Sequence, residues 1–175
     1  CQEMKALHDP DETVLDEELT RAMTPFSQKP GDVTVLRNRL QDVMWEDVGV
    51  MRDADGLQRG LKRIAEIDDE LSSVGVAADN LAFNLSWHDW LNLRSLIDMS
   101  MVIAKAALSR ENSRGAHFRE DFPDAGAMQE SYFTLASGYG DAISVTRAPV
   151  QFTIVKPGET LLGEDEAETL IKAAQ

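Results

Sequence analysis

The sequence contains one cysteine, Cys1, and no apolar run long enough to cross a membrane. One cysteine cannot form a disulfide within the chain, and a transmembrane helix needs about 18 or more largely apolar residues. We therefore expect no direct membrane insertion. Basic residues are also scarce, with 17 Lys and Arg against 31 Asp and Glu, which gives a net charge of −14. Because nucleic acids and anionic membranes require a basic surface, we expect neither as a partner.

The motifs of self-contained catalysis are missing as well. The glycines never form the G-x-G-x-x-G pattern that follows a strand in dinucleotide-binding domains. There is no phosphate-binding loop and no G-x-S-x-G nucleophile motif. His8, His88 and His117 lie far apart, and none has a second His or Cys at metal-ligand spacing. We expect no catalytic, cofactor-binding or metal-binding residue in this chain taken alone.

The 175 residues do contain three stretches of helical periodicity in a composition that is 43% hydrophobic and 27% charged. One stretch runs from Val33 to near Gly49. A second runs from a cap at Asp53 or Asp55 to Gly75, and a third from about Trp87 to Ser109. The apolar positions are Leu36, Leu40, Val43 and Met44; then Leu57, Leu61, Ile64, Ile67 and Leu71; then Leu93, Leu96, Ile97, Met101, Ala104, Ala107 and Leu108. Consecutive amphipathic helices bury their stripes against one another, which predicts a mainly α fold, a three-helix antiparallel bundle of the spectrin-repeat type.

This bundle is expected over residues 32–124, between two smaller segments. Residues 1–31 are predicted to be an acidic linker with a short helix from Asp11 to Met23, ending at the turn signal Pro30-Gly31. Residues 125–175 are predicted to form a β-hairpin extension and a short terminal helix. Its strands are expected at Ser131–Ala136 and Ala142–Thr146, with a third at Val150–Val155, a turn at Pro157-Gly158 and the helix at Glu164–Ala174.

Two segments stand out from this pattern. In the first, Met44–Arg52, the simplest interpretation is a helix end with Trp45 in the core and Gly49 as the C-terminal cap. In the second, Ala106–Pro123, a long apolar helix stops at a dense cluster of Arg, Glu, Asp and His. Such charges either pair locally in solvent, at about 0–1 kcal/mol each, or serve an interface through forked guanidinium groups. The sequence favours neither over the other.

These segments carry a resemblance to a known family. The run SRGAHFREDFP, Ser113–Pro123, closely resembles the S-R-G-x-H-x-R-x-D-[YF]-P segment of succinate dehydrogenase and fumarate reductase flavoproteins. L-aspartate oxidase and adenylylsulfate reductase are more distant relatives. The stretch from Leu36 through Arg52 is similar to the M-x-x-x-x-G-[IV]-x-R element of the same family. Two positions depart from the family pattern: Asn112 stands where Glu is usual, and Tyr132-Phe133-Thr134 stands where many members have a Trp and a His.

The resemblance implies that the chain is the C-terminal helical domain of such a flavoprotein subunit. FAD is then held by the amino-terminal domain of the intact subunit, which interconverts succinate and fumarate or a similar dicarboxylate pair. The partners implied are that FAD-binding domain and an iron–sulfur subunit. A cytoplasmic location is implied, with membrane association only through partner subunits. The residues implied at the interface with the flavin domain are Arg114, His117, Arg119, Asp121 and Arg52.

Two other functions are compatible with parts of the sequence. A free-standing helical binding module or lipoprotein without a redox role would explain the first residue, because mature bacterial lipoproteins begin with a modified Cys. A small enzyme using a carboxylate pair such as Glu120 and Asp121 ranks last, since acidic pairs are common in a chain this acidic.

Overall fold

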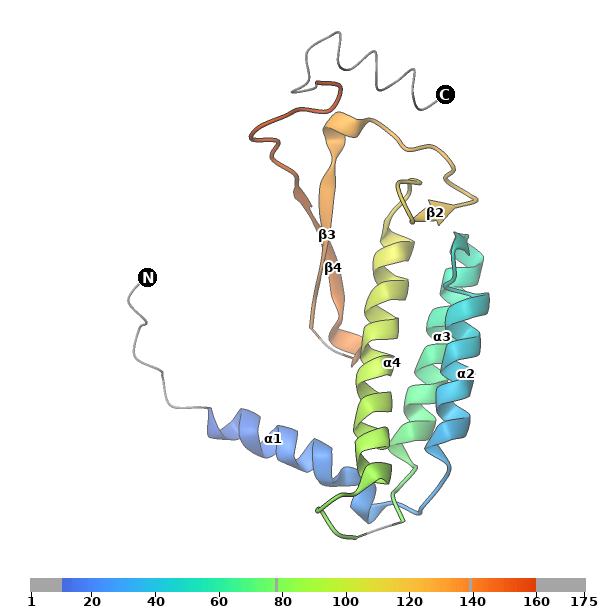
Figure 1. The fold of residues 1–175 in the computed structure, drawn as a ribbon, viewed down its shortest axis with the longest axis vertical. Helices are drawn as coiled ribbons and strands as arrows, with labels where there is room; N and C mark the ends of the chain where they lie inside the picture. Colours follow the sequence, from blue (N-terminus) through green and yellow to red (C-terminus); the bar gives the residue numbers. More distant parts are fainter. Residues whose placement is uncertain (1–10, 78, 139, 160–175) are drawn as a thin grey trace.

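Three long helices make an antiparallel bundle in the computed structural model, which describes residues 11–77, 79–138 and 140–159. They are α2 (Val33–Glu46), α3 (Ala54–Ser72) and α4 (Leu85–Ser109), and α3 packs against both of the others (Figure 1). The predicted helical bundle with a C-terminal hairpin is confirmed. No helix of the described ranges is both long enough and apolar enough to cross a membrane.

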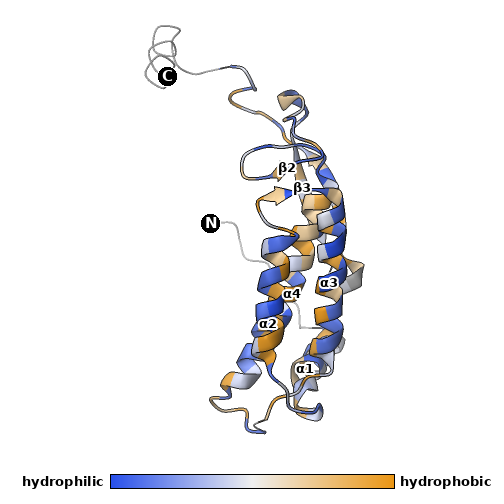
Figure 2. Ribbon diagram, turned by 90° about the vertical axis from the view of Figure 1, so that its right-hand side faces the viewer, coloured by the Kyte–Doolittle hydropathy of each residue, from blue (hydrophilic) through white to orange (hydrophobic). Residues whose placement is uncertain are grey.

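The core is built from the apolar positions that recur at helical spacing, and Figure 2 shows these alternating with polar positions around each helix. Its helical members are Leu36, Leu40 and Val43 from α2, Leu57, Ile64, Ile67 and Leu71 from α3, and Trp90, Leu93, Ile97, Ala104 and Ala107 from α4. The buried positions of α4 advance by alternating steps of three and four residues and include Ser100. Leu96 was expected in this face but lies beside it and is exposed.

The prediction that Trp45 lies in the core is wrong, because this side chain is 82% exposed. The inward stripe of α2 passes through Leu40 and Val43 and reaches Asp47 just past the helix end. Trp45 is two residues from Val43, about 200° around the helix, and therefore faces away from the bundle.

The start of α3 follows the predicted capping chemistry, whereas the predicted glycine caps at the helix ends do not form. Asp53 caps α3 by accepting a hydrogen bond of 2.7 Å from the amide of Gly56. The expected glycine caps at Gly49 and Gly75 are wrong: α2 ends at Glu46 and α3 at Ser72, and neither glycine has a positive φ. Both are instead sites of close backbone approach, since a Cβ on Gly75 would lie 2.2 Å from the carbonyl oxygen of Gln28.

Two short strands join the loop after α2 to the segment after α4. β1 (Met51–Arg52) pairs in parallel with β2 (Phe118–Arg119), with Arg52 beside Arg119. The pair lies where α2 and α4 end and α3 begins (Figure 1). We call this the β1/β2 end of the bundle.

The N-terminal helix α1 (Glu12–Met23) extends away from the bundle (Figure 1). It is followed by the 3₁₀ turn η1 (Thr24–Ser27). Trp87 of α4 anchors this junction, because its indole N–H donates to the carbonyl of Ala22 at 2.8 Å and its ring meets that of Phe26 edge-on. The predicted short helix is thus present, and none of its residues is buried.

The hairpin runs beside α4 (Figure 1) and consists of β3 (Tyr132–Ser137) and β4 (Ser144–Pro149). The strands are antiparallel, in register from Tyr132 beside Pro149 to Ser137 beside Ser144. Short 3₁₀ turns precede and connect them, η2 (Met128–Glu130) and η3 (Gly140–Ala142).

The third strand predicted at Val150–Val155 does not form. Val150 donates one backbone hydrogen bond to Ser131, at 2.9 Å, and the chain then leaves the sheet. Pro149 ends β4 there, because proline has no amide hydrogen with which to continue a ladder. The turn at Pro157-Gly158 is confirmed, whereas the helix predicted at Glu164–Ala174 lies outside the described residues.

Candidate functional site

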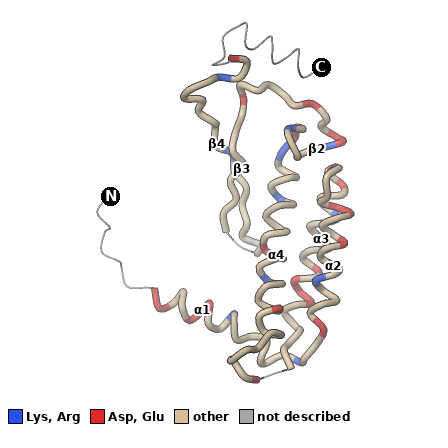
Figure 3. The backbone as a smooth tube through the Cα atoms, in the orientation of Figure 1, with Lys and Arg blue, Asp and Glu red and all other residues tan. Residues whose placement is uncertain are grey.

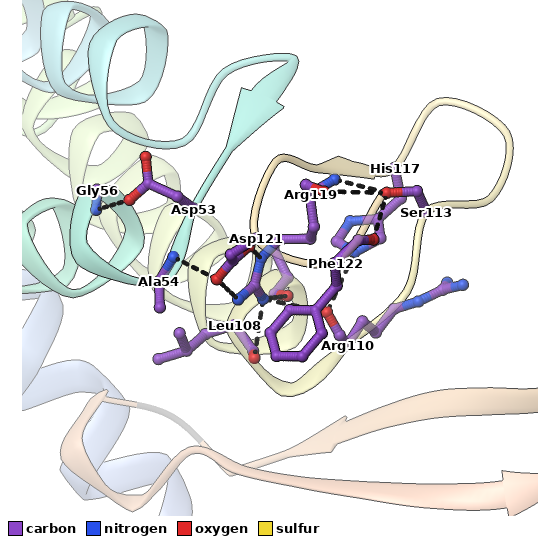
Figure 4. Close-up of polar contacts among 11 residues, drawn as sticks. Asp53, Ala54, Gly56, Leu108, Arg110, Ser113, His117, Arg119, Asp121 and Phe122 are labelled. Carbon is purple, nitrogen blue, oxygen red and sulfur yellow. Dashed lines mark hydrogen bonds and ion pairs between the residues drawn. The ribbon is translucent and has the colours of Figure 1, made fainter. Parts of the chain in front are cut away.

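Arg119 is the centre of the polar network at the β1/β2 end. Its side chain is 1% exposed, and its Nη1 donates to the carbonyl oxygens of Ala107, Leu108 and Arg110 at 3.1, 3.2 and 3.1 Å. The first two are among the last carbonyls of α4, and the third belongs to Arg110, just past the helix end, where carbonyls lack the amide partners of the helix interior. A cation at this position also opposes the negative end of the helix dipole. Arg119 therefore caps the C-terminus of α4 with a charged group (Figure 4).

Asp121 extends this cap to the start of α3. Its two carboxylate oxygens accept from Nε and Nη2 of Arg119 at 2.7 and 2.6 Å. One of them also accepts from the backbone amide of Ala54 at 3.0 Å, in the first turn of α3 (Figure 4). The hydrogen bonds from Arg119 are the main reason that the pKa of Asp121 is lowered to about 2. The pair thus joins the C-terminus of one helix to the N-terminus of another.

Ser113 braces the loop that carries this pair. Its hydroxyl accepts from the amide of Arg119 at 2.8 Å and donates to the carbonyl of Phe122 at 2.8 Å. The phenyl ring of Phe122 lies against the guanidinium of Arg119, 5.1 Å from Cζ to the ring centroid. The backbone of β2 is fixed from the other side, because the amide of Glu120 donates to the carbonyl of Arg52 at 2.7 Å.

Arg52 and His117 form a second contact across the same end. Nε of Arg52 donates to the carbonyls of Val48 and Gly49, just past α2, at 3.0 and 2.6 Å. Its Nη1 lies 2.9 Å from Nδ1 of His117. A guanidinium can only donate, so Nδ1 is the acceptor, and the imidazole is neutral with its proton on Nε2. Nε2 in turn faces the carbonyl of Arg110 at 3.5 Å.

This arrangement opposes protonation of His117. Burial is the main cause of its lowered pKa, and the charges of Arg110, Arg52 and Arg119 act in the same direction. Because the folded pKa is below the unfolded value near 6.5, the unfolded chain binds the proton more tightly. The stabilising contribution is complete above pH 6.5 and is lost as the pH falls through the folded pKa.

We predict that His117→Gln removes this part of the pH dependence. Glutamine can accept from Arg52 and donate to the Arg110 carbonyl, but it does not titrate. The free energy of unfolding of both proteins is measured by urea titration at pH 7 and pH 5. Between these two values the native protein should lose more unfolding free energy than His117→Gln does. His88→Gln is the control, since His88 is exposed on α4. Equal pH profiles for native and His117→Gln proteins would contradict the neutral assignment.

Arg114 organises the loop beyond the motif. Its Nη2 donates to the carbonyl of Ala127 at 2.8 Å and its Nη1 to the hydroxyl of Ser131 at 3.0 Å, while Nε donates to the carbonyl of Ala125. Its backbone pairs with that of His117 in an isolated bridge. All five residues expected at the interface from the sequence thus meet at one end of the bundle.

The sequence did not point to two further parts of this end. Asp47, buried just after α2, forms ion pairs with Arg59 and Arg63 of α3, both at 2.8 Å. The second is the backbone amide of Ala54, which donates to Asp121; a backbone group cannot be singled out from the sequence. An Arg twelve or sixteen residues after an Asp is too common to be noticed before the two helices are placed side by side. Among the described residues no group of His, Cys, Asp or Glu is arranged to hold a metal ion.

Residues 37–161 match the family model described as the C-terminal part of the fumarate reductase flavoprotein. The chain belongs to this family. The match covers the second segment that carried the resemblance and all of the first except Leu36, and it includes the residues of the β1/β2 end.

Curated relatives agree with this assignment. The chain is 31% identical over 138 residues to the succinate dehydrogenase flavoprotein subunit of Rickettsia bellii, covering 76% of this chain and 23% of that protein. It is 27% identical over 146 residues to the fumarate reductase flavoprotein subunit of Mycobacterium tuberculosis, covering 83% and 25%. An uncharacterised FAD-dependent oxidoreductase of Methanocaldococcus jannaschii is 33% identical over 119 residues, covering 67% and 21%. The chain spans about a quarter of the length of these relatives.

Solved structures share the fold. Sdh1 of Mycobacterium smegmatis, in complex with UQ1, matches with a TM-score of 0.71 at 27% identity, over 85% of this chain and 26% of that one. E. coli quinol fumarate reductase matches with a TM-score of 0.74 over 87% of this chain and 27% of the other. At 21% identity the second match supports the fold alone.

Proposed function

We propose that this chain is the C-terminal helical domain of an FAD-dependent flavoprotein subunit of the succinate dehydrogenase and fumarate reductase type, and that it acts as a buttress for the flavin domain of that subunit. Family membership and relatives that are FAD-dependent or named flavoprotein subunits support this. In this proposal FAD and the dicarboxylate bind elsewhere in the intact subunit. An iron–sulfur subunit is a further partner, and contact with a membrane runs through partner subunits.

The observation that carries the docking role is an exposed apolar surface at the β1/β2 end. It consists of Trp45, Val50, Met51, Phe118 and Phe122, which are all exposed. Met51 and Phe118 are register neighbours across the two parallel strands, so their side chains share one face. Clustered apolar side chains rimmed by charged groups are typical of interaction surfaces. We name these five residues the apolar end.

The charged network beneath gives this surface a fixed shape. Arg119 and Asp121 hold the ends of α3 and α4, while Arg52 and His117 hold the loop after α2. Arg114 holds the loop that leaves the motif. In this proposal the five sequence candidates form the seam of the docking surface, and the apolar end supplies its contact area.

We predict that Met51→Asp loosens the docked domain in the intact flavoprotein subunit. Met51 is 66% exposed here, so the substitution leaves the bundle core untouched. Placing a carboxylate in an apolar contact without a partner costs roughly 2 kcal/mol or more, about 30-fold in the docked population. The measurement is flavin retention on gel filtration together with the rate of limited proteolysis.

Leu81→Asp is the matched control, because Leu81 is an exposed leucine in the loop that precedes α4, at the opposite end of the bundle. It should behave like the native subunit. If Met51→Asp retains flavin and resists protease as well as Leu81→Asp does, the apolar end is not the docking surface.

A further inference from the structure

Three arginines around the end of α4 have no carboxylate partner. Arg21, Arg39, Arg59, Arg63, Arg94 and Arg119 each form an ion pair with an Asp or Glu. Among the residues whose placement is known, no ion pair is found for Arg37, Arg52, Arg110, Arg114 and Arg147, and the last three of these lie around the end of α4. Figure 3 shows basic segments gathered where α4 ends and β2 begins. In a chain with 31 acidic and 17 basic residues, three arginines without an ion pair at the end of one helix stand out.

Arg110 and Arg147 converge on one aromatic ring. Their Cζ atoms lie 6.0 and 4.6 Å from the centroid of the Tyr132 ring. Arg147 is exposed and also donates to the carbonyl of Ser109. A tyrosine ring and a helix C-terminus both attract cations, which explains how the two like charges are held near each other. Neither guanidinium forms an ion pair with a carboxylate in the described part of the chain.

Arg110 is also short of acceptors. Its Nη2 donates to Oδ1 of Asn112 at 3.3 Å, a neutral partner. Its Nε is buried and has no hydrogen-bond partner within the described part of the chain. A buried donor without an acceptor is costly, so the arrangement is incomplete as it stands. A group from outside the chain cannot reach this enclosed Nε, but an external carboxylate can accept from the terminal Nη groups of Arg110, for which the neutral Asn112 is the acceptor found in the described part of the chain.

We propose that Arg110 and Arg147 form a recognition site for a carboxylate, an Asp or Glu side chain of the flavin domain in the same subunit. Each guanidinium offers the fork of N–H groups from which a carboxylate accepts, and the shared Tyr132 ring brings the two groups into one place. The site adjoins the apolar end, since the Arg110 carbonyl accepts from Arg119 and Arg119 packs on Phe122. This proposal rests on the proposed function and adds the chemistry of the partner to it.

The test uses the intact subunit and measures hydrogen exchange of the peptides that cover residues 110–122 and 132–137. Arg147→Met and Arg110→Met are expected to lower the protection of these peptides at least about 30-fold, the effect of removing one partner of a docked charge pair. Raising NaCl from 0.05 to 0.5 M should reduce protection in the native subunit but not in the Arg147→Met variant. Asn112→Asp should also weaken docking, because it supplies Arg110 with an internal carboxylate.

Arg37→Met is the matched control, since Arg37 is another arginine for which no ion pair is found but lies on α2. The free energy of unfolding of each variant is first measured by urea titration on the free chain, so that loss of docking is separated from loss of folding. Protection within threefold of Arg37→Met, or an unchanged salt dependence in Arg147→Met, overturns the carboxylate site. If Met51→Asp still lowers flavin retention in that case, the carboxylate site is wrong but the docking role of the apolar end stands. If neither segment is more protected in the intact subunit than in the free chain, the proposed function fails with it.

Discussion

Replacing Arg119 by methionine is expected to destabilise the folded chain by about 3 kcal/mol. Methionine fills much of the same volume but cannot donate to the three carbonyls at the end of α4. It also leaves the carboxylate of Asp121 held by backbone amides alone, those of Ala54 and of Asp121 itself. Removing one partner of a buried ion pair costs about 3–5 kcal/mol, and the lower end applies because Asp121 keeps 30% of its side chain exposed.

The measurement is the free energy of unfolding from urea titration, with Arg39→Met as the matched control. Arg39 also pairs with a carboxylate, that of Glu70, but its side chain is 43% exposed. Exposed pairs contribute about 0–1 kcal/mol, so the control should lose little. Equal losses in the two variants would mean that Arg119 does not hold the helix ends together.

The pair of Arg119 and Asp121 should also make the stability of the folded chain depend on pH in the acid range. The folded pKa of Asp121, about 2, lies below the ordinary 3.8, so its contribution is complete above pH 4 and is lost as the pH falls toward 2. The stability difference between native and Arg119→Met proteins should therefore narrow over that range.

Gly75→Ala is expected to cost about 2–3 kcal/mol for a different reason. The added Cβ would lie 2.2 Å from the Gln28 oxygen and 2.6 Å from that of Pro25, both backbone atoms that a rotamer change cannot move. The amide of Gly75 donates to Lys29 at 2.8 Å, so any shift also disturbs the contact that ties the segment before α2 to the end of α3. Overpacking of this kind typically costs 1–3 kcal/mol.

Gly115→Ala is the comparison that separates crowding from backbone strain. Gly115 has a φ of +58° and open space around its missing Cβ, so alanine there meets only the conformational penalty of about 1 kcal/mol. Urea unfolding of the two variants should rank Gly75→Ala as the more damaging. The reverse order would show that the backbone near Gln28 can yield.

The bundle could be predicted because the stripe of apolar residues along each helix is long. Positions such as Leu57, Ile64 and Leu71 repeat over several turns, and only one helical register buries them together. A capping aspartate was predictable for a similar reason, since a short carboxylate before an apolar stripe has one obvious local role, but the sequence left Asp53 and Asp55 as alternatives.

The errors arose where a residue's role depends on a distant neighbour. Trp45 was expected to be buried because it is large and apolar, but it lies on the side of α2 that faces away from the bundle and is 82% exposed. Gly49 and Gly75 were expected to be left-handed caps, whereas the backbone that approaches Gly75 comes from residues 25–28. Val150–Val155 has the composition of a strand, but Pro149 ends β4 and the chain leaves the sheet after Val150.

The residues of the candidate site could be predicted from the sequence, but the contacts among them could not. Its residues could be identified from the motif, and their density of charge suggested either solvated pairs or an interface. That Arg119 would be buried under the end of α4 depends on the carbonyls of Ala107 and Leu108, which the sequence presents as an ordinary apolar helix. The unpaired charge of Arg110 and Arg147 was equally hidden, because the hairpin has to fold back along α4 before the two meet.

The most direct test of the docking role is a comparison of hydrogen exchange in the free chain and in the intact flavoprotein subunit. The account predicts strong added protection for peptides within residues 44–54 and 110–122, at the β1/β2 end, and no change for peptides within residues 79–86 at the opposite end. Added protection confined to the opposite end, or none at either end, would contradict the claim that this domain supports the flavin domain through its apolar end.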